Sequence, residues 1–154
     1  MIAQVTGPGA RLEEARALFL EYAESLGFSL CFQGFDEELR GLPGMYAPPR
    51  GRLLLAEEAG RPAGCVGLHE WNGDVAEMKR LYVPRSFRGR GLGRALTEAA
   101  LSEARSIGYR AVRLDTIASL MQPAIALYRE LGFREIAPYR EDPIPGALYL
   151  ELSL

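Results

Sequence analysis

The spacing of apolar residues changes along the chain, and each change marks the border of a predicted element. Recurrence at helical intervals predicts helices from Leu12 to Gly27, Asp36 to Leu42, Leu92 to Ile107 and Leu120 to Leu131. Short apolar runs bounded by turn residues predict strands at Ile2–Val5, Leu53–Glu57, Gly64–Trp71, Val75–Val83, Arg110–Asp115, Phe133–Ile136 and Ala147–Leu152. Asn72-Gly73 joins two of these strands and is typical of a tight hairpin.

The order of these elements predicts the fold class. A meander of strands is followed by strand–helix–strand–helix–strand, which favours a single α/β domain over residues 1–154. We expect a mixed central sheet of about six to seven strands with about four flanking helices. Ser119 and Gln122 fit a capping box at the start of the last helix, where Pro123 is tolerated in the first turn.

Composition narrows the class of protein without indicating a chemistry. The chain has 154 residues, of which 48% are hydrophobic and 25% charged, as in an ordinary globular domain. No apolar run approaches the ~20 residues that span a bilayer, and the N-terminus lacks the pattern of a signal peptide. We therefore expect a cytoplasmic protein in which Cys31 and Cys65 are free thiols. His69 is the only histidine, which excludes a multi-histidine site, and no metal is expected.

The net charge of −2 hides an uneven distribution. Residues 1–78 carry a net charge of −6, and residues 79–154 carry +4. One stretch without any acidic residue before Glu98 contains six basic residues: Lys79, Arg80, Arg85, Arg88, Arg90 and Arg94. Such a stretch attracts anions. A nucleic acid is one alternative, but the overall charge is not basic and no aromatic stacking platform accompanies the arginines.

The glycines inside this stretch indicate which anion is bound. Gly89, Gly91 and Gly93 lie where the strand ending at Val83 gives way to a helix. The N-terminus of a helix offers unpaired N–H groups and a partial positive charge, and glycines let phosphate oxygens approach that backbone. The pattern favours a pyrophosphate over the alternative of a flexible turn beside solvated arginines. Walker and dinucleotide motifs are rejected, because Gly-Lys-Ser/Thr is absent and Arg94 stands where a third glycine belongs.

Two segments resemble one enzyme family. Arg88-Gly89-Arg90-Gly91-Leu92-Gly93 matches the Gln/Arg-x-x-Gly-x-Gly/Ala motif of the GNAT family of acetyl-CoA-dependent N-acetyltransferases at every fixed position. Ala126-Leu127-Tyr128-Arg129-Glu130-Leu131-Gly132-Phe133 is similar to the second cofactor segment of that family. The order of elements also agrees, so the resemblance covers nearly the whole chain. It implies a GNAT-like fold and transfer of an acetyl group to an amine.

The resemblance also implies how acetyl-CoA is held. In the family, the strand before the glycine loop separates from its neighbour, and its backbone pairs with the pantetheine arm; here Leu81 and Val83 would supply those contacts. The pyrophosphate would lie on Arg88 and on the backbone N–H groups of Gly89, Arg90, Gly91, Gly93 and Arg94. A neutral primary amine would attack the thioester directly in a ternary complex, with the N–H of Leu81 stabilising the oxyanion.

Two side chains are candidates for proton transfer. Glu77 stands eleven residues before Arg88, a spacing at which some family members carry a catalytic glutamate; the alternative is a solvent-facing strand residue. Tyr128 matches the tyrosine that commonly protonates the departing thiolate, and the alternative is a tyrosine packed in the core. The lone histidine is interpreted as structural. Weaker candidates for the base are Glu70 and Asp115.

The sequence departs from the family at one position and leaves the acceptor open. Met121 stands where many members carry an asparagine, so that contact to acetyl-CoA is missing or is taken over by Ser119 or Gln122. The first helices would shape the acceptor pocket, and their region contains Phe28, Cys31, Phe32, Phe35, Asp36, Glu37, Glu38 and Tyr46. Aromatic rings beside carboxylates could receive a cationic amine; an ordinary amphipathic helix with a solvated acidic face is the alternative. The connection from Tyr139 to Tyr149 either closes over the acceptor site or only joins two strands.

Two functions follow from this pattern. The first is an N-acetyltransferase acting on a small-molecule or peptide amine. The second is a catalytically silent acyl-CoA-binding regulatory module, which would keep Arg88 to Gly93 but would not depend on Glu77 or Tyr128. Neither a nucleic acid nor a membrane is expected as a partner. Family members are frequently dimers, so the resemblance leaves a homodimer open.

Overall fold

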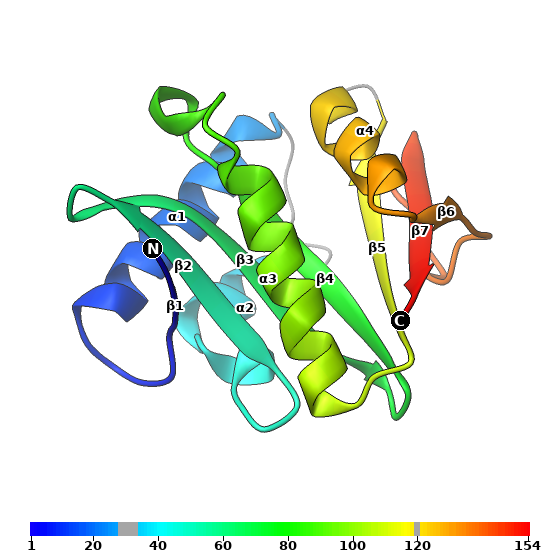
Figure 1. Cartoon of the computed structure of the whole chain (residues 1–154), viewed down its shortest axis with the longest axis horizontal. Coiled ribbons are helices and arrows are strands. Elements are labelled where there is room, and N and C mark those ends of the chain that lie inside the picture. Colours follow the sequence, from blue (N-terminus) through cyan, green and yellow to red (C-terminus); the bar gives the residue numbers. More distant parts are fainter. Residues whose placement is uncertain (28–33, 119–120) are drawn as a thin grey trace.

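The fold is built on one mixed sheet. The computed structural model describes residues 1–27, 34–118 and 121–154. The sheet has the strand order β1-β2-β3-β4-β5-β7-β6 (Figure 1). Its strands are β1 (Ile2–Gln4), β2 (Arg52–Glu58), β3 (Arg61–Asn72), β4 (Val75–Tyr82), β5 (Ala111–Ile117), β6 (Arg134–Glu135) and β7 (Ala147–Ser153). The helices are α1 (Ala10–Ser25), α2 (Phe35–Arg40), α3 (Leu92–Ile107) and α4 (Gln122–Glu130), with short 3-10 turns η2 (Gly44–Tyr46) and η3 (Arg85–Phe87).

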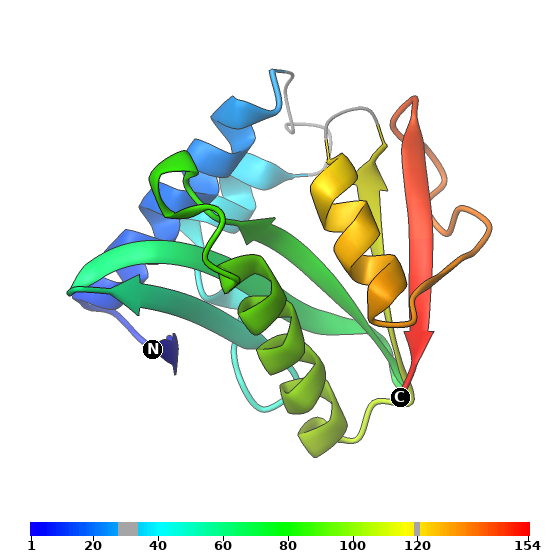
Figure 2. The same cartoon turned by 45° about the horizontal axis from the view of Figure 1, so that its top comes forward.

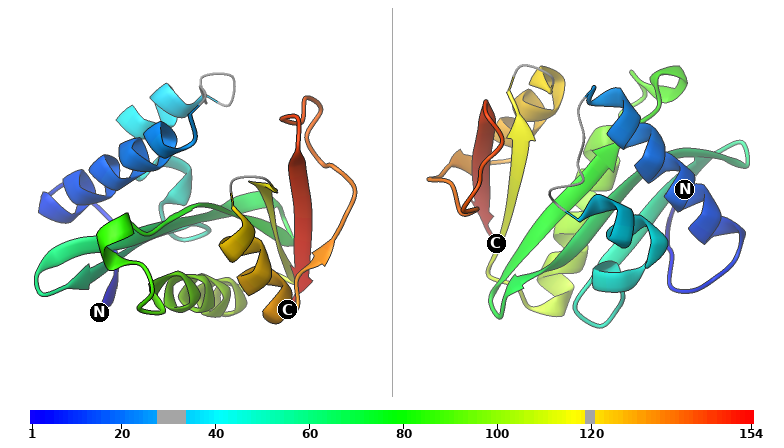
Figure 3. Two further views of the ribbon diagram at one scale, coloured as in Figure 1. Left: turned by 90° about the horizontal axis from the view of Figure 1, so that it is seen from above. Right: turned by 180° about the vertical axis from the view of Figure 1, so that it is seen from behind.

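The helices form a layer on each face of the sheet. Figure 3 shows α1 and α2 on one face and α3 and α4 on the other. Alternate residues of β2 enter the two cores: Leu53 and Leu55 pack in the α1–α2 cluster, whereas Leu54 and Ala56 pack in the α3–α4 cluster. Because both faces are covered, the strand reads as a continuous apolar run rather than an alternating one. The predicted single α/β domain is confirmed.

The start of α4 differs from the sequence prediction. The helix begins at Gln122 rather than Leu120, and its N-cap is Met121, whose side chain caps no backbone group. The Gln122 amide donates to the carbonyl of Ala118 instead of completing a capping box. The Met121 sulfur accepts a hydrogen bond from Thr116 at 2.8 Å, which ties the N-cap to β5. Ser119 lies outside the described residues.

The central strands position the candidate site. β1 to β4 form an antiparallel meander, β4 and β5 pair in parallel, and β7 pairs antiparallel with both β5 and β6. The chain must cross the sheet between β4 and β5, and α3 makes that connection. Within the described residues, no helix is long and apolar enough to cross a membrane.

Candidate active site

The two central strands of the sheet separate beyond Glu77. β4 pairs with β5 only from Val75–Ala111 to Glu77–Arg113. Figure 2 shows the strands diverging from that point toward the starts of α3 and α4. The rest of β4 therefore presents backbone groups to the opening that no described strand covers, and such groups are free to bond a ligand.

The start of α3 offers a row of backbone donors beside this opening. From Gly89 to Arg94, no N–H group donates to a main-chain carbonyl of the described residues, and the first helical bond runs from Ala95 to the carbonyl of Gly91 at 3.0 Å. Gly91 is the N-cap and has φ +77°, a conformation that glycine adopts without strain. The donors lie at the positive end of the helix dipole, an arrangement that suits a phosphate.

The arginine side chains around this row are partly paired with carboxylates. Arg90 contacts Glu58 at 2.7 Å and Arg94 contacts Glu130, and all four side chains are partly or largely exposed. Arg88 instead donates from Nε to the carbonyl of Val83 at 2.8 Å. Exposed ion pairs are worth only about 0–1 kcal/mol and exchange readily for another anion. A phosphate bound here would contact the backbone N–H groups, with the exposed arginine side chains around it.

A β-bulge interrupts β4 next to the opening. Cys65 pairs with Tyr82 and Gly67 pairs with Lys79, so that Val66 alone lies opposite two residues, Arg80 and Leu81. Lys79 and Arg80 consequently both leave the strand on the α1–α2 side, and Leu81 packs against the α3–α4 core. Burial and the adjacent charge of Arg80 lower the pKa of Lys79.

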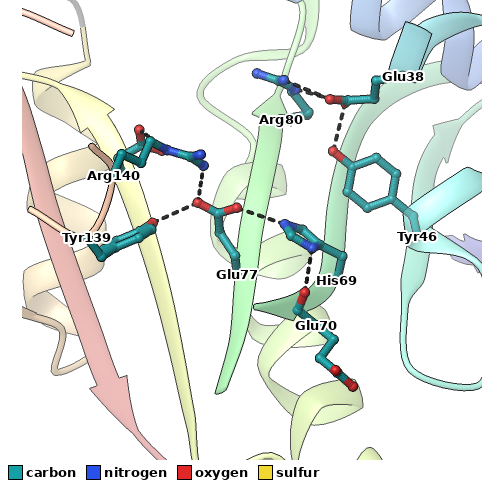
Figure 4. A network of polar contacts seen from close by, with 9 residues as sticks. Glu38, Tyr46, His69, Glu70, Glu77, Arg80, Tyr139 and Arg140 are labelled. Carbon is teal, nitrogen blue, oxygen red and sulfur yellow. Dashed lines mark hydrogen bonds and ion pairs between the residues drawn. The ribbon is translucent and has the colours of Figure 1, made fainter. Parts of the chain in front are cut away.

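Glu77 lies at the divergence point inside a dense polar cluster. Its side chain is only 1% exposed, so the solvent-facing alternative is wrong. One carboxylate oxygen contacts His69 Nε2 at 2.8 Å, and the other accepts a hydrogen bond from Tyr139 at 2.8 Å and contacts Arg140 (Figure 4). Arg140 Nε also contacts Asp115 at 3.1 Å. We call these five residues the Glu77 cluster.

The donors around Glu77 hold it in the ionised form. Burial alone would raise the pKa of Glu77, but the hydrogen bond from His69 and the charges of Lys79 and Arg140 outweigh it and lower the pKa to about 2. Burial and the neighbouring Glu77 carboxylate raise the pKa of Tyr139, so its hydroxyl keeps the proton that it donates. The Glu77 carboxylate is therefore a fixed negative charge surrounded by hydrogen-bond donors.

The connection between β6 and β7 supplies part of this cluster. Tyr139 and Arg140 reach back to Glu77, and the Tyr139 ring packs edge-on against Trp71 and Tyr149, with ring centroids 4.8 Å and 5.0 Å apart. The segment therefore does more than join the last two strands, because it also contacts Glu77 at the divergence point; closure over an acceptor site stays a prediction.

Tyr128 stands on the opposite side of the opening. It lies on α4, is 5% exposed and packs against Phe133 at a ring-centroid distance of 5.5 Å. Burial and the neighbouring Tyr22 hydroxyl raise its pKa, so that it stays protonated. The ring is thus packed in the core, as the alternative interpretation from the sequence expects, and the role of its hydroxyl as a proton donor stays a prediction.

Most of the chain matches one family of enzymes. Residues 13–133 match the sequence profile of the Acetyltransferase (GNAT) family. The chain belongs to this family. An uncharacterized N-acetyltransferase of Schizosaccharomyces pombe is 38% identical over 145 residues, which cover 93% of this chain and 88% of that protein. The chain is thus an N-acetyltransferase.

Solved GNAT structures share the fold. An acetyltransferase from Streptococcus agalactiae superposes with a TM-score of 0.81 at 19% identity, covering 100% of this chain and 98% of that one. A GNAT family acetyltransferase from Elizabethkingia anophelis, solved with acetyl-CoA bound, has a TM-score of 0.70 at 22% identity and covers 100% of this chain and 97% of its own.

The GNAT fold brings together some predicted residues and separates others. Glu77 and Asp115 join one cluster through Arg140, whereas Glu70 is exposed and pairs with Arg50 at 2.9 Å. Phe35 and Tyr46 are buried, and the guanidinium over the Phe35 ring belongs to Arg80, at 5.1 Å. The Phe35 ring therefore receives a cation from the chain itself. Phe28, Cys31 and Phe32 lie outside the described residues.

The partners of Glu77 leave little signal in the sequence. The two ring nitrogens of His69 lie 2.8 Å from the Glu77 carboxylate and from the Glu70 carbonyl, contacts that agree with the structural role expected of this residue. Tyr139 and Arg140 are separated from Glu77 by more than sixty positions, so no local spacing links them. Among the described residues, no group of three or more His, Cys, Asp or Glu is arranged to hold a metal ion.

Proposed function

We propose that this enzyme transfers the acetyl group of acetyl-CoA to a primary amine by direct attack in a ternary complex. The observation that carries the proposal is the row of free N–H groups from Gly89 to Arg94, which lies at the start of α3 beside the opening between β4 and β5. That geometry fits a pyrophosphate followed by an extended arm lying between the two strands. The acetyl-CoA bound to a solved relative with the same fold supports the same co-substrate here.

The residues that would hold acetyl-CoA are those of the glycine loop and the adjacent strand. Arg88 and the backbone of Gly89, Arg90, Gly91, Gly93 and Arg94 would contact the pyrophosphate, and the backbone of Leu81 and Val83 would pair with the pantetheine arm. A Cβ added at Gly93 would meet no atom within 4 Å, so the space in front of the donors is open. When bound, acetyl-CoA supplies an acetyl group activated as a thioester.

The bulge of β4 would stabilise the negative charge that develops during attack. A bulge leaves one residue out of the ladder, and the N–H of that residue would then donate toward the opening. We assign this role to the N–H of Leu81, next to the divergence point. A single preorganised donor of this kind is worth about 10²–10³ in turnover.

We propose that the ionised Glu77 carboxylate stabilises the positive charge that develops on the attacking amine. Its low pKa keeps it ionised at every physiological pH, and this charge favours the ammonium that forms when nitrogen attacks. A base with a pKa of about 2 draws a proton only weakly, so electrostatic stabilisation contributes more than proton abstraction. The ammonium would then release its proton to solvent, and Tyr128 would regain from solvent the proton that it gives to the CoA thiolate.

Tyr128 is proposed as the proton donor to the departing thiolate. Its raised pKa keeps the hydroxyl protonated, and its position on α4 places it across the opening from β4. Arg140 and Tyr139 hold Glu77 in place and do not enter the transfer.

The experiment that tests this function is thiol release from acetyl-CoA in the presence of a panel of primary amines. We expect release to depend on the amine and to yield one acetylated product per thiol. Binding of acetyl-CoA without release for any amine would support the alternative of a catalytically silent acyl-CoA-binding module. Absence of both binding and release would contradict the proposal.

A further inference from the structure

We propose that Arg80, Glu38 and Tyr46 are positioning residues for acetyl transfer: together they hold the bulge of β4 in the conformation that presents the Leu81 N–H to the acetyl group. We call these three residues the Arg80 cluster. The inference rests on the function proposed above and concerns groups that touch neither substrate.

The backbone at Arg80 needs external support. Its φ is +63°, in the left-handed region that non-glycine residues avoid at a cost of about 1–2 kcal/mol. Ala59 is the other such residue in the described ranges, and it lies in the turn between β2 and β3. Within the sheet, the strained residue is therefore the one directly before Leu81. Strain of this kind persists only where the surroundings hold it.

A buried ion pair provides that support from the α2 side. Arg80 Nε lies 3.0 Å from Glu38 Oε2 and Nη2 lies 2.9 Å from Oε1, and the two side chains are 3% and 7% exposed (Figure 4). This two-point contact fixes both position and orientation of the guanidinium. Burial opposes ionisation of Glu38, but the hydrogen bond and the charge of Arg80 prevail and lower the pKa of Glu38.

Two further contacts fix the partners of the ion pair. The Tyr46 hydroxyl donates to Glu38 Oε2 at 2.7 Å, and its ring packs closely on β3 at Gly67, where a Cβ would lie 2.5 Å from the ring. On the other side of the bulge, the Cys65 thiol donates to the carbonyl of Arg80 at 3.4 Å. Burial raises the pKa of Cys65, so the thiol keeps its proton.

The Arg80–Glu38 ion pair is better explained by its effect on the geometry of the β4 bulge than by a contribution to the free energy of unfolding. A buried ion pair rarely adds net stability, because desolvation offsets the attraction. Here it joins α2 and η2 to a single strained peptide next to the divergence point. Fixing that peptide would preorganise the oxyanion donor, the one group whose placement must be accurate before the amine attacks.

The test compares Arg80→Ala with Arg80→Gly. Both substitutions delete the guanidinium, but only glycine adopts φ +63° without strain. We expect Arg80→Ala to lower kcat about 100-fold with the acetyl-CoA Kd changed less than about threefold, and Arg80→Gly to keep kcat at least about tenfold higher than alanine. Glu38→Gln should lower kcat about tenfold with KM for acetyl-CoA nearly unchanged. Equal kcat for the two Arg80 variants would overturn the inference.

A spectroscopic readout separates this inference from the proposed function. The amide resonance of Leu81 should shift between the complex with CoA and the complex with acetyl-CoA, and this shift should disappear in Arg80→Ala and Glu38→Gln but persist in Arg80→Gly. A wild-type protein without thiol release would refute the function, whereas an active wild type whose Leu81 amide ignores the acetyl group would refute the inference. If Arg80→Ala fails to fold, the Arg80→Gly and Glu38→Gln spectra decide.

Discussion

The two sides of the site are built in opposite ways. On the side proposed to bind acetyl-CoA, consecutive backbone N–H groups from Gly89 to Arg94 form an open surface at the start of one helix. On the side proposed to bind the acceptor, the Glu77 cluster gathers buried and half-buried side chains from β3, β4, β5 and the connection to β7. The first side needs little more than a turn and a helix, and the second needs the whole sheet to be correctly assembled.

This difference predicts where each side is vulnerable. A backbone site loses function when a side chain blocks it, while the fold remains. A buried cluster loses stability when one partner is removed, because the remaining charges stay behind in a medium of low polarity. Substitutions on the two sides should therefore separate binding of acetyl-CoA from stability.

Glu77→Gln should produce the largest loss of stability. The pKa of Glu77 is lowered from 4.5 to about 2, which corresponds to about 3 kcal/mol of unfolding free energy. That contribution is fully present above about pH 4.5 and is lost as the pH falls through about 2. Chemical denaturation at several pH values should show the difference from wild type shrinking over this interval. Glu70→Gln, which removes an exposed carboxylate on the neighbouring strand, serves as the control and should change little.

Gly91→Val should abolish tight binding of acetyl-CoA. Valine at φ +77° distorts the turn and places a branched side chain among the donors, and we expect Kd to rise at least about 100-fold, or about 2.7 kcal/mol. Gly108→Val is the matched control, because Gly108 ends the same helix with φ +109° and open space around its Cα. Calorimetric titration should show wild-type affinity in the control. Retained affinity in Gly91→Val would refute the backbone site.

Tyr128→Phe tests whether the Tyr128 hydroxyl, across the opening from β4, takes part in acetyl transfer. Loss of the hydroxyl should lower kcat about 100-fold, at the lower end of the range for general acid catalysis, and leave the acetyl-CoA Kd within about twofold. Tyr109→Phe removes another buried hydroxyl, which donates to the carbonyl of Arg50, and should leave kcat unchanged. Unchanged steady-state kinetics in Tyr128→Phe would remove it from the mechanism.

Gly67→Ala tests the packing of the Tyr46 ring on β3, away from the backbone donors of Gly89 to Arg94. The added Cβ would lie 2.5 Å from the Tyr46 ring, and overpacking of this kind costs about 1–3 kcal/mol. Thermal unfolding should report the loss, while acetyl-CoA affinity stays close to wild type. Gly73→Ala, in a turn where the added Cβ meets nothing within 4 Å, is the control. A stable Gly67→Ala protein would contradict the tight packing of Tyr46 on β3.

Arg94→Ala should have the smallest effect. Arg94 and Glu130 are 45% and 63% exposed, so the stability change should stay within about 0.5 kcal/mol. The Kd for acetyl-CoA should rise less than about tenfold, because the backbone donors remain. A larger rise in the same titration would mean that side chains, rather than the backbone, carry the binding on this side.

The two sides also differ in how far the sequence revealed them. The spacing of Gly89, Gly91 and Gly93 between a strand and a helix is a local pattern, and it indicated the acetyl-CoA side and the fold around it. Glu77 was singled out by its distance from Arg88, but its environment was not foreseen. Its partner Arg140 is brought to it by the pairing of β7 with β5, a contact between distant segments that no periodicity encodes.

The net charge of each half of the chain likewise does not predict which charged residues pair in the fold. Residues 1–78 are acidic and residues 79–154 are basic, yet Glu38 pairs with Arg80 and Glu58 pairs with Arg90 across that border. A net charge sums over residues whatever their distance, whereas ion pairs depend on which elements the fold brings together. The strained φ of Arg80 likewise follows from strand register and leaves no trace in composition.

The most direct test of the acetyl-CoA side is amide hydrogen exchange measured by NMR with and without CoA. If the backbone from Gly89 to Arg94 holds the pyrophosphate, these amides should exchange rapidly in the free protein and at least about tenfold more slowly with CoA bound. Amides at the far end of α3, near Ile107, should change little. Tight binding of CoA that leaves the exchange of Gly89 to Arg94 unchanged would contradict the account.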